Sequence, residues 1–211
     1  MSTTVADVRW LIVVLGLVVV ATACSSSSSS SSSSSEPGTS PAPSASPPVV
    51  DFSATVTPGA EEIVVRWSLT NRSGDELLVP NLVPDSAGRF SSTANTVYVV
   101  PGTDADVELV KKAFEASGDA GDSLPSVGFT RLADGAVVEE VVRVPLPLSG
   151  YSPDGGASVP PDATSVVFCV GVVSPPFIAS MGFNEHDGIE TMNHGVAATQ
   201  QHVFCSEPAE L

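Results

Sequence analysis

Histidine and methionine side chains gather near the end of this sequence in a pattern that could hold a metal ion. His186, Met192 and His194 lie close together and His202 follows, and these include all three histidines of the chain. Thioether and imidazole ligands together favour copper, whereas imidazole with a carboxylate such as that of Asp187 suits zinc. The spacing of His186 and His194, however, matches no helical ligand pair. The sequence therefore favours a polar surface loop and keeps a copper or zinc site as the alternative.

A second chemical feature is Cys24, which precedes eleven consecutive serines. The small residues Ala21 and Ala23 stand before it, as in bacterial lipoprotein signals, where the cysteine thiol receives a diacylglycerol and becomes the first residue after cleavage. The apolar run that begins at Trp10 has about 14 residues, whereas a membrane span needs about 20. We therefore expect a signal peptide over 1–23 and a lipid-modified Cys24, with an ordinary cleaved signal or an uncleaved anchor as the alternatives.

The two remaining cysteines, Cys169 and Cys205, form an even pair in a chain expected outside the cytoplasm. Each lies in an apolar run typical of a β-strand, and the short spacing of a redox or zinc-binding cysteine pair is missing. We expect a structural disulfide, which would close a loop of about 36 residues and contribute roughly 3 to 4 kcal/mol.

No catalytic motif accompanies these residues. The sequence has neither the G-x-S-x-G nor the S-x-x-K pattern of serine enzymes. We expect a protein that is not an enzyme and that needs no cofactor.

Charge limits the partners. The formal net charge is −16, and the residues after the signal include only seven basic side chains. Because nucleic-acid binding requires lysine and arginine to neutralise phosphates, we expect no nucleic-acid partner. The same negative charge disfavours flat binding to anionic lipid, so membrane contact should come through the acyl chains alone. We expect a monomer whose partner, if it has one, is an envelope protein or a cell-wall component.

Composition divides the chain into three parts. Apart from Cys24 and Glu36, residues 24–48 are serine, proline, alanine, glycine and threonine with no large apolar side chain, so they cannot form a core and are predicted to be a disordered tether. Residues 49–211 alternate short apolar runs with turn residues and are predicted to fold as one ectodomain on the extracytoplasmic face of the cell membrane.

Period-two patterns predict strands in this domain. Apolar residues alternate along 63–70, and the turn residues of 71–75 predict a hairpin with 76–79. Asp134-Gly135 predicts a second hairpin, between 129–132 and 137–144. Further strands are expected at 96–100, 165–173 and 200–205, while the segment 104–115 fits either a helix or a strand.

Many short strands with almost no helical periodicity predict an all-β fold, namely a single antiparallel β-sandwich of immunoglobulin-like (Ig-like) architecture. Trp67 is expected in the core, beside Phe168 and the disulfide.

The lipoprotein signal, the Ser/Pro tether, the segment TNRSGDELLV, the strand FCVGVV and the terminal FCS together are similar to uncharacterised lipoproteins of high-GC Gram-positive bacteria (actinobacteria). The resemblance implies a fold and a cellular address, and no activity. The leading hypothesis is a non-catalytic, lipid-anchored binding module; a metal-binding protein using His186, Met192, His194 and His202 and an inert surface spacer are the alternatives.

Overall fold

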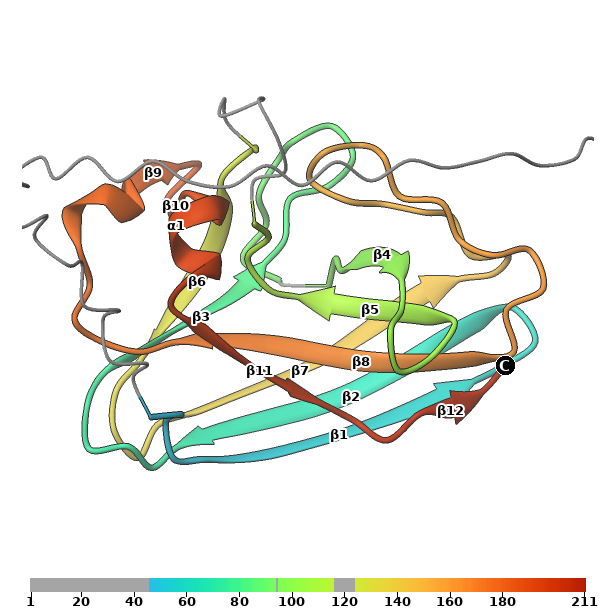
Figure 1. Ribbon diagram of the computed structural model, residues 1–211, viewed down its shortest axis with the longest axis horizontal. Coiled ribbons are helices and arrows are strands. Elements are labelled where there is room, and N and C mark those ends of the chain that lie inside the picture. Colours follow the sequence, from blue (N-terminus) through green and yellow to red (C-terminus); the bar gives the residue numbers. More distant parts are fainter. Residues whose placement is uncertain (1–45, 94, 116–123) are drawn as a thin grey trace, which may run out of the picture. The chain divides into compact units, whose positions relative to one another are not determined.

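Two β-sheets packed face to face make up the part of the chain that the structure describes, residues 46–93, 95–115 and 124–211 of a computed structural model (Figure 1). The small sheet has the order β1 (Val50–Pro58), β2 (Glu62–Asn71) and β7 (Val137–Pro145). The large sheet has the order β4 (Tyr98–Pro101), β5 (Val107–Lys111), β8 (Ser165–Val173), β3 (Leu77–Leu82), β6 (Val127–Leu132), β10 (Ile189–Met192) and β9 (Asn184–His186). β11 (Gln201–Cys205) and β12 (Ala209–Glu210) also pair with β8. Two short helical segments, η1 (Ala179–Met181) and α1 (His194–Ala198), lie before and after β9 and β10.

The predicted all-β sandwich is confirmed, and the alternation along β2 shows how the sequence specifies it. Ile63, Val65, Trp67 and Leu69 are buried between the sheets, while the residues between them lie on the outer face. β8 is buried along nearly its whole length because both of its faces pack against apolar clusters. One strand pair departs from the antiparallel prediction, because β5 runs parallel to β8.

Both predicted hairpins are wrong. β2 pairs with β7 and not with β3, and β6 pairs with β3 and not with β7. The turns at 71–75 and 133–136 therefore each carry the chain from one sheet to the other. The turn residues do mark places where the chain changes direction, but glycine and asparagine do not specify which sheet receives the next strand.

The two crossing turns are joined by buried Asn71. Its backbone N–H donates to the carbonyl of Ala136 at 3.0 Å, and its carbonyl accepts from the N–H of Gly135 at 2.9 Å. Its side-chain amide donates to the carbonyls of Leu132 and Asp75, at 2.8 and 2.7 Å. Asn71 thus fixes the corner where two antiparallel strands pass together from the small sheet to the large one.

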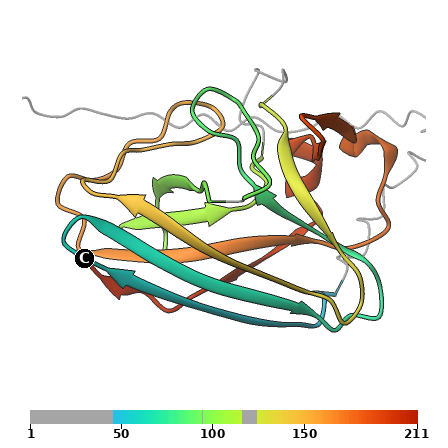
Figure 2. The ribbon, with the colours of Figure 1, turned by 180° about the vertical axis from the view of Figure 1, so that it is seen from behind.

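The two long sides of the sandwich differ. On the β1 side, the rings of Phe52 and Phe204 lie 6.2 Å apart and join β1 to β11. On the other side the small sheet ends at β7, which has no neighbouring strand beyond it in the described parts of the chain (Figure 2).

Candidate functional site: the free edge of β7

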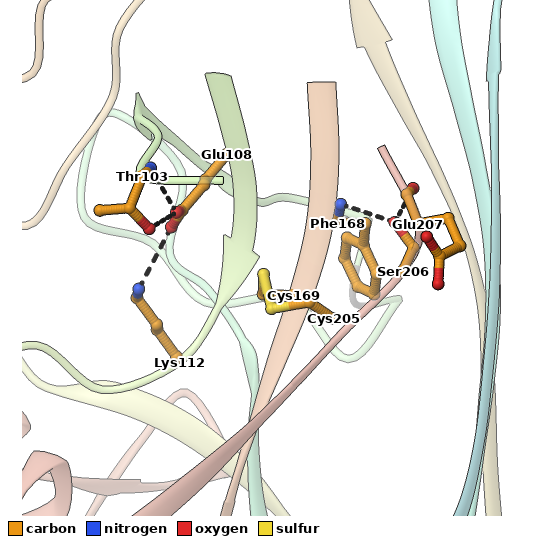
Figure 3. The surroundings of a disulfide bond; sticks show 8 residues. All are labelled: Thr103, Glu108, Lys112, Phe168, Cys169, Cys205, Ser206 and Glu207. Atoms are coloured by element: carbon orange, nitrogen blue, oxygen red, sulfur yellow. Dashed lines mark hydrogen bonds and ion pairs between the residues drawn. A yellow bond between two sulfur atoms is a disulfide. The ribbon is translucent and has the colours of Figure 1, made fainter. Parts of the chain in front are cut away.

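The predicted disulfide is confirmed. Cys169 on β8 and Cys205 on β11 are directly opposite each other in the register and are bonded (Figure 3). The expected core pair is also found, with the rings of Trp67 and Phe168 5.8 Å apart. The disulfide does not lie beside this pair, because Phe168 and Cys169 are consecutive in a strand and point to opposite faces.

The predicted lipid site, Cys24, lies outside the described residues. Within those residues, no helix is long and apolar enough to cross a membrane.

The structure does not bring the candidate metal ligands together. Met192 is fully buried in an apolar cluster, and His186 is exposed on β9 with its ring stacked 6.1 Å from that of Phe90. His202 lies on β11, opposite Val172. Among the residues whose positions are described, no group of three or more His, Cys, Asp or Glu side chains is arranged to hold a metal ion.

Both ring nitrogens of His194 already have partners in the protein. The backbone N–H of Phe114 donates to Nδ1 at 3.1 Å, so Nδ1 is the unprotonated nitrogen and Nε2 carries the hydrogen. Nε2 then donates to the hydroxyl of Tyr98 at 3.2 Å. His194 is 1% exposed, and this burial lowers its pKa from 6.5 to about 4. His194 therefore acts as a neutral hydrogen-bonding residue that holds α1 to the large sheet.

The hydrogen bonds at the two ends of the β2–β7 pair show which backbone groups of β7 face outward. Leu146 donates to the carbonyl of Glu61, and Asn71 donates to that of Ala136. Because antiparallel pairs alternate between bonded and non-bonded positions, the even-numbered residues of β7 bond to β2 and the odd-numbered residues face away from it. The backbone groups of Glu139, Val141 and Arg143 therefore line the free edge, and no hydrogen bond from the described residues reaches them.

Two hollows follow this edge. The first, here called the edge cleft, has a volume of about 350 Å³ and is lined by Asn81, Leu82, Ser92, Thr93, Thr130 and residues 138–141. The second edge cleft, of about 330 Å³, lies farther along β7 and is lined by 95–97, Val99, 143–145, Pro147 and Ser149. The two hollows together border β7 at residues 138–141 and 143–145.

A third hollow, the outer trough, lies on the outer face of the small sheet. Its volume is about 500 Å³, and its lining residues are Ser53, Thr55, Arg66, Trp67, Ser68, Glu139, Glu140 and Val141. Residues 139–141 of β7 line both the outer trough and the edge cleft. The two hollows therefore meet along a three-residue stretch of an edge strand.

Arg66 is the cation of the outer trough. Of the seven basic side chains after the signal, all of which are described, six form ion pairs with carboxylates. Arg66 is exposed on β2, and no ion pair or hydrogen bond joins its side chain to any described residue. Ser53 and Ser68, whose hydroxyls are 2.9 Å apart, share the trough with it. In a protein of net charge −16, an arginine without a carboxylate partner is a donor group that an anionic ligand could use.

The inner side of β7 holds a buried ion pair. Glu140 points between the sheets, and its carboxylate lies 2.8 Å from Nζ of Lys111 on β5; the two side chains are 8% and 0% exposed. Lys111 also donates to the carbonyl of Asn81 at 2.8 Å, and the Asn81 amide donates to Glu140. This network joins β7 to β5 and β3 across the sandwich.

Burial acts on both members of this pair in opposite directions. It lowers the pKa of Lys111 and raises the pKa of Glu140, and in each case the charge of the partner opposes the effect. Leaving either charge buried without its partner would be strongly unfavourable. The ion pair therefore fixes the position of β7 relative to the large sheet.

A further hollow, of about 470 Å³, lies at the far end of the sandwich. It is lined by Pro58, Gly59, Leu146, Pro147, Leu148, Val159, Pro160, Pro161, Ala163 and Leu211. It has apolar walls but no ionisable or hydroxyl side chain to orient a ligand, unlike the hollows beside β7.

Comparison of the chain with protein-family models, with curated proteins and with solved structures finds no match in any of the three.

The residues of the β7 edge were not among those singled out from the sequence. A signal for the ion pair was present, since Glu140 interrupts the apolar face of Val138, Val142 and Val144, and Lys111 continues the face of Val107 and Leu109. No signal in the sequence could have shown that β7 lies at an edge, because that depends on which strands pair.

Proposed function

We propose that this chain is a non-catalytic, lipid-anchored binding protein of the cell envelope, and that its ligand is held at the free edge of β7. The proposal depends on one observation: two polar hollows, the outer trough and the edge cleft, meet at residues 139–141 of β7. No residue that the structure describes makes a hydrogen bond to the outward backbone groups of this strand.

Two features support the location. The signal-like segment that ends at Cys24 supports a lipid anchor, and the Cys169–Cys205 disulfide suits an oxidising compartment outside the cytoplasm. The Ser/Pro-rich tether, whose root-mean-square reach is about 25 to 30 Å by flexible-chain scaling, would hold the binding surface away from the lipid.

The binding surface is tested by photo-crosslinking in intact cells. A benzophenone-bearing amino acid replaces Val141 on β7 or, as the matched control, Val203 on β11; the two valines are 47% and 43% exposed. We expect a discrete adduct from position 141 and none from position 203. No adduct at 141 would favour the inert spacer, and equal adducts at both positions would contradict a specific surface.

The anchor is tested by fractionation. Cys24→Ala should move the protein out of the membrane fraction, because no acyl chain can then be attached, whereas Ser25→Ala should leave it there. A Cys24→Ala protein that stays in the membrane fraction would contradict the lipid anchor.

A further inference from the structure

We propose that the free edge of β7 binds an extended peptide segment as an added β-strand, and that this segment places an acidic side chain on Arg66. This inference rests on the proposed function, because it identifies the ligand of the same surface.

The backbone geometry of β7 matches a peptide. Glu139, Val141 and Arg143 present N–H and C=O groups outward at every second residue, which is the spacing that an extended polypeptide satisfies when it extends a sheet. The β2–β7 register is continuous over nine residue pairs without a bulge. The edge is therefore regular enough for pairing along several residues.

Other strand edges are less suited to this role. β4 and β9 contain only four and three residues. β1 is the other edge strand of the small sheet, and on that side its Phe52 ring packs against Phe204 of β11. Natural sheets protect long edges with charges, prolines or bulges. β7 carries Glu139 and Arg143 on its outer face, but Arg143 is paired with Glu62 and proline stands only at the end, position 145.

Space and charge specify what the peptide carries. The two edge clefts, of about 350 and 330 Å³, border β7 at residues 138–141 and 143–145, where an added strand would begin to contact the protein. A ligand residue opposite Val141 would share a row with Arg66, because Arg66 pairs with Val141. Two interstrand spacings place its Cα about 10 Å from that of Arg66, a distance that an arginine and a glutamate side chain span together.

Glu139 lies in the next row of the same face, where it is opposite Ser68. Its carboxylate would oppose an acidic ligand residue in that row and favour a basic one. The ligand is therefore expected to carry an acidic and a basic side chain two residues apart, the acidic one in the row of Arg66.

The test uses the full-length lipoprotein purified in detergent and a random nine-residue peptide library displayed on phage. Enriched sequences are synthesised as free peptides, and their Kd values are measured with the wild-type protein, Val141→Pro and Val141→Thr. Because the N–H of Val141 faces away from β2, Val141→Pro removes an outward donor and keeps the β2–β7 hydrogen bonds. We expect Val141→Pro to weaken binding at least tenfold and Val141→Thr to change it by less than about twofold.

Two changes to the peptide complete the test, and the first does not depend on how well the variants fold. N-methylation of one alternating set of peptide residues should abolish binding, whereas methylation of the other set, whose N–H groups face solvent, should not. Replacing the peptide glutamate by glutamine should weaken binding to wild type about tenfold but have little effect with Arg66→Ala, since the ion pair is already lost.

Strand addition is refuted if no peptide is enriched, or if both methylated sets bind alike. A glutamine peptide that binds wild type as well as the glutamate peptide overturns the role of Arg66. A crosslink from position 141 without any peptide enrichment would leave the binding surface in place and reject the peptide as its ligand.

Discussion

Lowering the pH should destabilise this domain through one histidine, His194. In the folded protein burial lowers its pKa from 6.5 to about 4. Between these two values the unfolded chain binds more protons than the folded one, so the stability that neutral His194 contributes is present above pH 6.5 and is lost as the pH falls towards 4. The two pKa values differ by about 2.5, and each pKa unit corresponds to about 1.36 kcal/mol, so the expected loss is about 3 kcal/mol.

The assay is urea unfolding of the ectodomain from residue 44 onward at several pH values between 4 and 7.5, followed by the fluorescence of buried Trp67. The wild type is compared with His194→Gln, which lacks a group that titrates in this range. Between pH 7.5 and pH 4, the free energy of unfolding of the wild type should fall by about 3 kcal/mol more than that of His194→Gln.

Tyr98→Phe is the control, because it removes the hydroxyl partner of Nε2 but leaves the imidazole buried and Nδ1 bonded to Phe114. It should keep the pH dependence of the wild type. If the free energy of unfolding of the wild type and of His194→Gln changed with pH in the same way, the imidazole would not be buried and neutral. His194 would then again be a candidate metal ligand.

Three further perturbations test how the sandwich is held together, each by the free energy of unfolding in urea. Lys111→Met should cost about 3 to 5 kcal/mol, because it leaves Glu140 buried without its cation. Most of this loss should be recovered in the double variant that also carries Glu140→Leu. A Lys111→Met protein as stable as wild type would show that the two charges are not buried together. Asn71→Ala should cost about 1 to 3 kcal/mol, because the buried carbonyl of Leu132 loses its donor and the partly buried bond to the carbonyl of Asp75 is also lost, and a loss below about 0.5 kcal/mol would contradict its role at the corner. Replacing both Cys169 and Cys205 by alanine should cost about 3 to 4 kcal/mol, and thiol titration of the denatured, unreduced ectodomain should find no free thiol from this pair.

Local patterns predicted β2, β3, β4, β6, β7, β8, β11 and the disulfide, but they left β5 open between helix and strand, missed β1, β9, β10 and β12, and did not predict how the strands pair. Period-two alternation predicts β2, because successive side chains of a strand point to opposite faces and the apolar ones mark the buried face. The Asn- and Gly-containing turns were interpreted as hairpins, since a hairpin is the shortest connection between two strands. In the structure the two turns cross between the sheets and are held together by hydrogen bonds between Asn71 and residues 132–136. These residues are far apart in the sequence, so no local pattern could predict the contact.

The candidate site shows the same limit. The cluster of His186, Met192 and His194 is close in sequence and yet contributes to three different surroundings, namely a surface strand, an apolar core and a buried hydrogen-bond pair. Arg66 and Val141, by contrast, are far apart in sequence and lie in one row of the small sheet. Proximity along the chain suggested the metal site that the sequence kept as an alternative, and among the described residues no group of three or more His, Cys, Asp or Glu side chains is arranged to hold a metal ion.

The two-residue period of β7 separates its structural role from its proposed binding role. The backbone groups of the even-numbered residues form hydrogen bonds with β2, and their side chains point to the interior, where Glu140 forms an ion pair with Lys111. The backbone groups of the odd-numbered residues point to the free edge, and their side chains lie on the outer face. A strand held rigidly from one side can offer a preorganised edge on the other, so a ligand that adds to it loses only its own conformational freedom. The net charge of −16 opposes close approach of a second copy to the same edge, and the local positive charge of Arg66 is the contact that we propose for an acidic ligand residue.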